Sequence, residues 1–293
     1  MYNDNFIAFY DQGVFMNSFF SKLDTELFCK HFCGGLTANA NTPFHCHDGY
    51  EILIFLGGTT SFYVEHQCTS LSKGDIICCP PYTFHRALPK SEQDYERVLI
   101  NFSEANLLTL NSAHTNLAQC FYNKSVPYRI LHLNTDELTT LLQYTQRLEN
   151  CFTDSFFGND VLQKALLTEI LVMLNRQTPE QSSKNHINTY SPIVTKIFSY
   201  IEAHYREEFR IKHLADELHH NADYLTRCFK KTTGCSIQQF VIAKRVNLAQ
   251  KLLREGNTPL DACYLSGFEN YSNFSRTFTK HTGISPKKYQ LNT

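Results

Sequence analysis

The fold of this chain is decided by two stretches of sequence, ADYLTRCFKKTTGCSIQQF at residues 222–240 and YSNFSRTFTKHTGISPKKY at residues 271–289. The second repeats the first at a constant offset of 49 residues, from residue 222 to residue 271, with Arg, Phe, Lys, Thr, Gly and Ser in register. Apolar positions match as well, since Leu225 corresponds to Phe274. Such self-similarity indicates two copies of one supersecondary unit.

Each copy follows a short helical pattern and a tight turn. Before the first copy, residues 211–218 predict a helix, and Asn221 in the turn is a suitable N-cap for the helix that follows. Before the second copy, residues 259–266 predict a helix, and Gly267 and Phe268 form the turn, with Phe268 expected to anchor it in the core. The sequence therefore predicts two helix-turn-helix units.

The segment between the two units, residues 238–254, places apolar residues at helical spacing and predicts a connecting helix. A rigid helix would hold the units at a fixed separation. A spacing of about one turn of DNA, ~34 Å, would present both second helices to one face of a duplex.

In a helix-turn-helix unit the second helix enters the major groove, where exposed side chains contact base edges and phosphates. Arg227 and Arg276 occupy equivalent positions of the repeat and can pair with guanine. Asp223 suits a cytosine contact and the capping of its own helix equally well. The predicted DNA-binding residues are Asp223, Thr226, Arg227, Lys230, Ser272, Asn273, Ser275, Arg276 and Lys280.

Charge is distributed unevenly along the chain, whose formal net charge is −1. Residues 192–293 hold 15 Lys and Arg against 9 Asp and Glu, a net charge of +6, and the remainder holds 12 against 19, a net charge of −7. The basic part suits a polyanion such as double-stranded DNA, and the acidic part does not.

The N-terminal half predicts β-structure followed by helices. Short runs rich in β-branched and aromatic residues, bounded by Gly and Pro, recur at residues 50–56, 61–65, 75–79 and 97–102, a pattern typical of a small barrel or sandwich. Two helical patterns, at residues 134–148 and 158–173, then either pack within this domain or pair two protomers.

A polar, nearly core-free segment at residues 177–191 is the predicted linker. We therefore expect two domains, a β-barrel with its helical pair and an all-α domain with two helix-turn-helix units joined by a long helix. Their predicted bounds are residues 1–176 for the first domain, 177–191 for the linker and 192–293 for the second domain.

The composition, with 42% hydrophobic and 19% charged residues, is typical of a soluble globular protein. No apolar run is long enough to cross a bilayer, and residues 1–10 lack the basic and apolar regions of a secretory signal. Eleven cysteines without a Cys-x-x-Cys pair indicate reduced thiols. We expect a cytoplasmic protein without a membrane segment.

At the level of motifs the C-terminal third resembles the AraC/XylS family of transcription regulators. The resemblance is carried by Leu214 and Ala215, by Arg245, and above all by GFENYSNFSRTFTKHTGISPKKY at residues 267–289. The chain departs from the family pattern at Ala262, Cys263, Ser266 and Gln290.

The resemblance implies a cupin-like N-terminal barrel that binds a small-molecule effector, followed by helices that pair two protomers. It also implies a homodimer that binds double-stranded DNA and activates transcription by contacting RNA polymerase. A regulator of this kind is not an enzyme and needs no cofactor. Aromatic faces with a few polar groups suit a sugar as effector, and other small polar molecules too.

Histidines near the predicted strands leave the role of the barrel open. His45, His47, Glu51 and His85 have the residue types and the spacing of metal-binding cupins, so a metal held for sensing or catalysis is the alternative function. The same histidines could also merely shape the mouth of the barrel. The predicted effector-binding residues are Phe44, His45, His47, Glu51, Phe62, His85 and Arg86.

Overall fold

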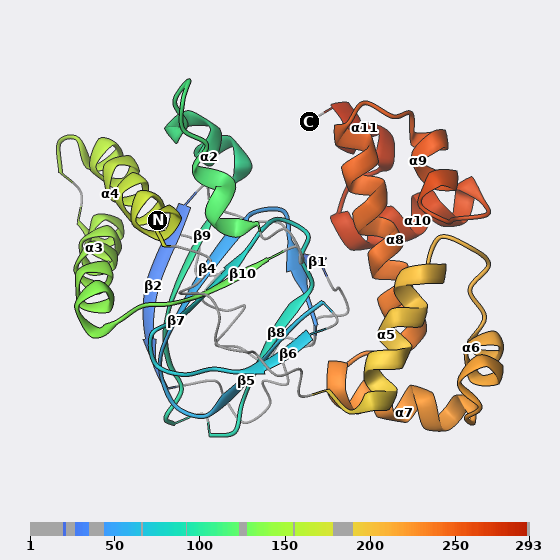
Figure 1. The fold of residues 1–293 in the computed structure, drawn as a ribbon. Coiled ribbons are helices and arrows are strands. Elements are labelled where there is room, and N and C mark those ends of the chain that lie inside the picture. Colours follow the sequence, from blue (N-terminus) through green and yellow to red (C-terminus); the bar gives the residue numbers. More distant parts are fainter. Residues whose placement is uncertain are drawn as a thin grey trace.

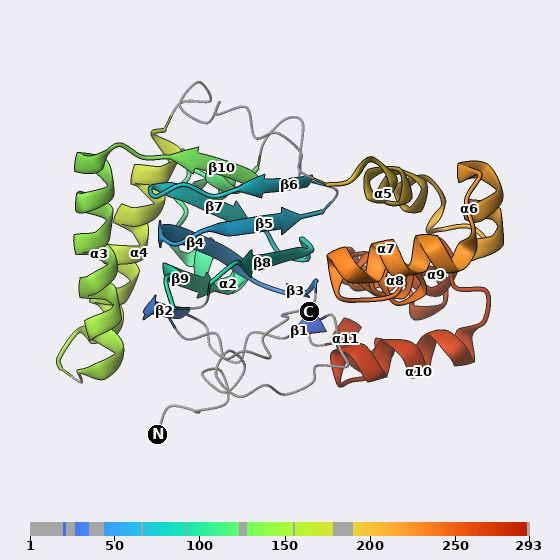
Figure 2. The ribbon, with the colours of Figure 1, turned by 90° about the horizontal axis from the view of Figure 1, so that it is seen from below.

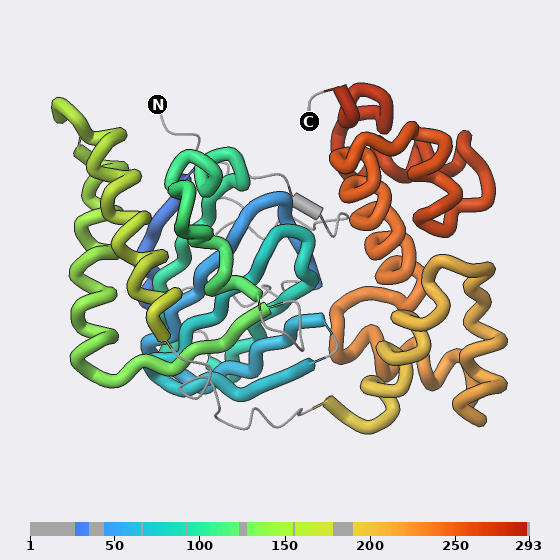
Figure 3. Tube along the Cα trace, turned by 45° about the horizontal axis from the view of Figure 1, so that its top comes forward, coloured from blue at the N-terminus to red at the C-terminus, as the bar shows by residue number. Residues whose placement is uncertain are grey.

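The computed structural model describes residues 20–21, 27–34, 44–65, 67–91, 93–122, 128–154, 156–177 and 190–291. These residues form three successive layers: a pair of helices, a body of β-strands and a group of C-terminal helices (Figures 1 and 3). Figure 2 shows the strands lying between the helical pair α3–α4 and the C-terminal helices.

The β body consists of two antiparallel sheets. Five strands lie in the order β10-β7-β4-β9-β2, three lie in the order β6-β5-β8, and a short parallel pair joins β1 to β3. The strands are β1 (Phe20–Ser21), β2 (Leu27–Cys33), β3 (Cys46–His47), β4 (Tyr50–Gly57), β5 (Thr60–Val64), β6 (Gln67–Ser70), β7 (Asp75–Cys79), β8 (His85–Pro89), β9 (Glu96–Phe102) and β10 (Arg129–His132).

Strand β4 is buried on both faces, and its alternation determines what faces the interior of the β body. Ile52 and Ile54 pack in the core shared with the covering helices, whereas Leu53 and Phe55 pack with residues of β5 between the two sheets. Because side chains alternate along a strand, Glu51 belongs to the interior set. A carboxylate is thus placed inside the barrel.

Helices cover the outer face of the five-stranded sheet, so the predicted helical pair packs within its own domain. Helix α3 begins with a capping box in which Asn134 accepts from the Glu137 backbone and Glu137 accepts from the Asn134 backbone. The covering elements are α2 (Glu104–Leu110), the 3₁₀ helix η1 (Leu117–Phe121), α3 (Thr135–Thr153) and α4 (Asn159–Asn175). The prediction of a cupin-like barrel with a following helical pair is confirmed.

The C-terminal layer is entirely helical and has two cores. Phe198, Phe229 and Phe240 lie in the first core, and Phe274 and Phe278 lie in the second. The helices are α5 (Pro192–His204), α6 (Ile211–Leu218), α7 (Ala222–Thr233), α8 (Ile237–Arg254), α9 (Pro259–Leu265), α10 (Tyr271–Thr282) and α11 (Pro286–Leu291). Both predicted helix-turn-helix units and the connecting helix α8 are present.

The positions that depart from the family pattern pack well in the second unit. Ala262, Cys263 and Ser266 are fully buried, and the Ser266 hydroxyl donates to the Ala262 carbonyl at 2.5 Å. Phe268 is buried in the same core, as expected for the residue that anchors the turn. Gln290 donates from its side chain to the Asn257 carbonyl at 2.9 Å, so its role here is to hold α11 against the end of α8.

Helix α4 ends at Asn175 and α5 begins at Pro192. Residues 178–189, which make up most of the predicted linker 177–191, lie outside the described residues. Among the helices that the structure describes, none has both the length and the apolarity needed to cross a bilayer.

Candidate functional site

Helices α7 and α10, the second helices of the two units, begin alike. The Asn221 side chain accepts from the backbone N–H of Asp223 at 2.8 Å, and the Asn270 side chain accepts from that of Asn273 at 3.0 Å. These caps satisfy N–H groups that a helix start leaves without partners. One face of each helix is then fixed in its core, and the opposite face is left to solvent.

The predicted DNA-binding residues lie on these outward faces. Thr226 on α7 and Ser275 on α10 are half-buried, and the other predicted residues of both helices are exposed. Arg276 is positioned by its own helix, since its Nε donates to the Ser272 carbonyl at 3.4 Å. The assignment of each side chain to a base or a phosphate stays a prediction.

Inside the barrel, His47, Glu51 and His85 form a buried group, here called the histidine cluster. They come from β3, β4 and β8. His47 Nε2 lies 3.1 Å from Glu51 Oε2, and His85 Nε2 lies 3.3 Å from Glu51 Oε1. Phe62 stacks on His85 with 6.1 Å between ring centroids, and His45, which is half-buried, lies 4.5 Å from His85 by the same measure.

The hydrogen bonds of the two buried imidazoles determine which nitrogen faces Glu51. His47 Nδ1 lies 2.9 Å from the Gly49 carbonyl, and His85 Nδ1 lies 2.9 Å from the Thr83 carbonyl. A carbonyl only accepts, so both Nδ1 atoms carry a proton. In a neutral imidazole Nε2 would then present a lone pair to a carboxylate oxygen. Two lone pairs that face each other repel, so the approach of Nε2 to the Glu51 carboxylate is favourable only with a cation between the two atoms, either a proton on Nε2 or a metal ion.

The charges in the cluster follow the same logic. Burial alone would raise the pKa of the Glu51 carboxyl, but the neighbouring His85 and His47 hold this pKa well below its usual range. Burial would lower the pKa of His85, and the Glu51 carboxylate outweighs burial and raises it. Within the described residues, His85 Nε2 has no partner with hydrogen-bond geometry.

Two of the predicted effector residues point elsewhere. Phe44 is fully buried against the C-terminal helices, with 6.0 Å between its ring centroid and that of Phe198 and the same distance to Phe240. The Arg86 guanidinium donates from Nη1 to the Thr232 carbonyl at 2.9 Å, at the end of α7. The structure therefore brings His45, His47, Glu51, Phe62 and His85 together, and it places Phe44 and Arg86 between barrel and C-terminal helices.

Two family models match the chain, an AraC-like ligand binding domain over residues 35–171 and a helix-turn-helix domain over residues 214–292. The chain belongs to the AraC family of transcription regulators. It combines a ligand-binding domain with a helix-turn-helix DNA-binding domain, so it is a DNA-binding transcription regulator.

Relatives of this AraC-family regulator extend over most of its length. The uncharacterized HTH-type transcriptional regulator YfiF of Bacillus subtilis is 25% identical over 283 residues, 93% of this chain and 87% of that protein. The Msm operon regulatory protein of Streptococcus mutans is 23% identical over 83% of this chain and 84% of its own. The raffinose operon transcriptional regulatory protein RafR of Pediococcus pentosaceus is 25% identical over 83% of this chain and 85% of its own.

Polar contacts between the two domains of the regulator were not predicted from its sequence. Glu65 follows β5, and its carboxylate accepts from the Phe84 N–H at 2.9 Å and pairs with Lys244 of α8 at 3.1 Å. Lys244 also pairs with Glu202 of α5. Burial would lower the pKa of Lys244, but Glu65 and Glu202 raise it, so this ammonium stays charged inside the contact.

Tyr82 is a second such contact. Its φ of 64° lies in the left-handed region, which costs a residue with a Cβ about 1–2 kcal/mol. Its hydroxyl hydrogen-bonds that of Tyr289 at 3.0 Å, and the Arg254 guanidinium lies 4.4 Å from its ring centroid. Asn247 donates to the Tyr82 carbonyl at 3.2 Å.

Beside these contacts lies a cleft of about 900 Å³ between the barrel and α8. Tyrosines and charged groups line much of it, including Tyr50, Tyr82, Tyr205, Lys251 and Arg254. A cleft of this size holds a small molecule, and its walls belong to both domains.

Proposed function

We propose that this regulator activates transcription when a small-molecule effector bound by the barrel alters the position of its DNA-binding helices. One observation carries the proposal. His85 and Arg86 are neighbours in β8, and His85 belongs to the histidine cluster while Arg86 binds the last turn of α7. A ligand that displaces β8 therefore changes the histidine cluster and the contact between Arg86 and α7 at the same time.

The Arg86 contact is well suited to transmit such a change. A helix ends with carbonyls that lack partners and carry partial negative charge, so a guanidinium there stabilises one position of the helix. Helix α7 also carries the predicted DNA-binding residues Thr226, Arg227 and Lys230. Effector binding shifts DNA affinity only by the difference between its affinities for the two arrangements.

We propose a sugar as effector. A related regulator is named for the raffinose operon, and the barrel offers an aromatic face at Phe62 beside the polar atoms of His45, His85 and Glu51. Sugars are bound by such combinations of rings and hydrogen-bonding groups.

We further propose a cytoplasmic homodimer that contacts RNA polymerase and has no enzymatic activity, with the domain limits 1–176, 177–191 and 192–293. The helical pair α3–α4 supports the dimer, because apolar side chains at its surface are left to solvent. Phe157, Val161 and Val172 are exposed on or beside α4. Exposed apolar groups gathered on one element are typical of an interaction surface.

The test uses the full-length chain. DNA sequences are selected from a random duplex pool, and affinity for the selected sequence is measured with and without each of a panel of sugars that includes raffinose and melibiose. We expect one sugar to raise the melting temperature of the chain and to change its DNA affinity. In Arg86→Met the sugar should still raise the melting temperature, but its effect on DNA affinity should be smaller. A chain that selects no sequence would refute the proposed function, and equal coupling in the variant would refute the route through Arg86.

A second candidate function is a metal ion in the histidine cluster, held for sensing or catalysis. The observation that favours it is the pair of imidazoles whose Nε2 atoms face Glu51 while their Nδ1 atoms bind carbonyls, an arrangement typical of metal-ligating histidines. Elemental analysis of full-length protein purified without chelator tests it. Near-stoichiometric iron, zinc or manganese that disappears in His47→Ala would support it, and metal-free protein that still responds to a sugar would exclude it.

A further inference from the structure

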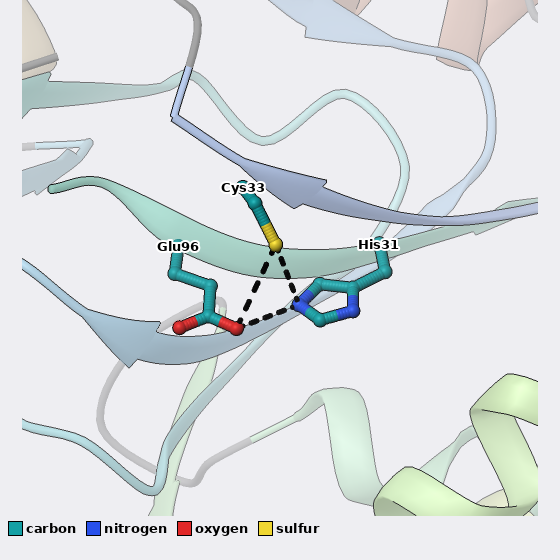
Figure 4. A group of neighbouring side chains, drawn as sticks. All are labelled: His31, Cys33 and Glu96. Atoms are coloured by element: carbon teal, nitrogen blue, oxygen red, sulfur yellow. Dashed lines mark hydrogen bonds and ion pairs between the residues drawn. The ribbon is translucent and has the colours of Figure 1, made fainter. Parts of the chain in front are cut away.

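A second group of metal-ligating side chains lies at the edge of the five-stranded sheet. It consists of His31, Cys33 and Glu96, here called the edge triad (Figure 4). His31 and Cys33 are two residues apart on β2, so their side chains leave the same face of the strand. Glu96 on β9 is the direct cross-strand partner of Cys33. Residues paired in this way share a face, and the three side chains converge.

The distances in the edge triad match one face of a tetrahedral zinc site. His31 Nε2 lies 2.9 Å from Glu96 Oε1, Cys33 Sγ lies 3.6 Å from His31 Nε2, and Cys33 Sγ lies 3.8 Å from Glu96 Oε1. Usual zinc bond lengths at tetrahedral angles place N and S about 3.6 Å apart, O and S about 3.5 Å apart and N and O about 3.3 Å apart. Shifts of a few tenths of an ångström in side chains that are partly exposed would complete the geometry.

The electrostatic surroundings also favour a cation. Glu149 of α3 accepts from the His31 backbone N–H at 3.3 Å, which brings a second carboxylate close to the triad. A divalent cation would neutralise this excess of negative charge and stabilise the thiolate, with the thiol proton released to solvent.

We infer that the edge triad binds a divalent metal ion of borderline softness, of which Zn²⁺ is the type, through imidazole, thiolate and carboxylate. The His31 and Glu96 side chains are 33% and 41% exposed, so solvent can supply a water as fourth ligand. The ion would fasten β2, an edge strand of its sheet, to β9 beside helix α3. This site is separate from the histidine cluster, which contains no sulfur.

The test uses reduced, metal-free, full-length protein titrated with Co²⁺. We expect a thiolate-to-cobalt charge-transfer absorption that saturates at one equivalent per chain and is abolished by Zn²⁺. Cobalt held only by His47, Glu51 and His85 would not produce this absorption, because none of these residues supplies sulfur. Cys33→Ser should remove it, and the control Cys228→Ser, which changes a half-buried cysteine of α7, should keep it.

Glu96→Gln tests the carboxylate. It should lower the affinity for Co²⁺ by at least about tenfold. Removal of a residue that only hydrogen-bonds to a metal ligand already lowers metal affinity by about tenfold or more, and removal of a direct ligand should lower it at least as much. Far-UV circular dichroism of each variant checks that the fold is retained. Absence of the absorption in the wild-type chain, its persistence in Cys33→Ser, or unchanged affinity in Glu96→Gln would each overturn the inference.

Discussion

Gly267, at the turn of the second helix-turn-helix unit, offers a sharp test of how that unit is held in place. Its φ is +94°, and a Cβ added there would lie 2.7 Å from both the Cα and the carbonyl oxygen of Arg206. Gly256, after α8, is a matched control. Its φ is +89° and a Cβ there would meet no atom within 4 Å. Both glycines end a helix with the same pattern, since Phe268 N–H binds the Cys263 carbonyl and Asn257 N–H binds that of Leu252.

The magnitudes follow from this difference. An alanine forced to a left-handed conformation costs about 1–2 kcal/mol, and this is the whole expected loss for Gly256→Ala. Gly267→Ala adds the overlap with the Arg206 backbone, which cannot rotate away as a side chain would. Insertion of a methyl group into a packed site costs typically 1–3 kcal/mol, so we expect a total loss of roughly 2–5 kcal/mol.

Urea unfolding of the full-length variants, followed by far-UV circular dichroism, measures both losses. Equal m-values are needed for the comparison, because a change in m would indicate a change in the unfolded or native ensemble. If Gly267→Ala and Gly256→Ala lose the same stability within about 0.5 kcal/mol, the close approach of the turn to Arg206 is not what makes Gly267 necessary.

Three further predictions concern DNA binding, the contact between the two domains and the proposed dimer surface. Arg276→Ala should reduce the free energy of binding to a selected DNA sequence by on the order of 1–3 kcal/mol and relax the base preference at one position. Lys280→Ala should weaken binding to all sequences and make binding less dependent on salt concentration. Equal losses on selected and random duplexes for both variants would contradict this division. Lys244→Met should lower the free energy of unfolding by roughly 3 kcal/mol in the same urea assay, because it leaves the Glu65 carboxylate buried beside an apolar side chain. An unchanged free energy of unfolding would mean that the Glu65–Lys244 ion pair does not stabilise the fold. If α4 is the dimer interface, Val161→Asp should convert the dimer to a monomer, and the molar mass measured by light scattering should halve. An unchanged mass would mean that the dimer interface lies on another face.

The elements that the sequence predicts well are those with a local signal. The cap at Asn221 is set by residues within a few positions of one another and appears where expected, and within each copy of the repeat the helix predicted from its own apolar spacing is present. The buried strands around Ile52 and Ile77 are recognisable for the same reason, since each is a continuous apolar run between turn residues.

The contacts between domains have no local signal. The sequence predicts Phe44 and Arg86 as effector-binding residues of the barrel interior together with the histidines, whereas the structure places both between the barrel and the C-terminal helices. Their partners at Thr232 and Phe240 lie more than a hundred residues away in the sequence, and no periodicity indicates such a pairing. The edge triad escaped detection similarly, because Cys33 meets Glu96 only through the register of β2 against β9.

The aromatic core formed by Phe44, Phe84, Phe198 and Phe240 has a practical consequence for engineering. Its members come from both halves of the chain, so exchanging the sensor of this regulator for that of another would bury mismatched surfaces against each other. A hybrid with a new inducer should respond only if Phe44 and Phe84 are grafted along with the foreign barrel. The two domains of this protein are therefore not independent modules, because they share a hydrophobic core. Residues to be kept or exchanged in a hybrid are chosen by their contacts in the structure and not by a single crossover position in the sequence.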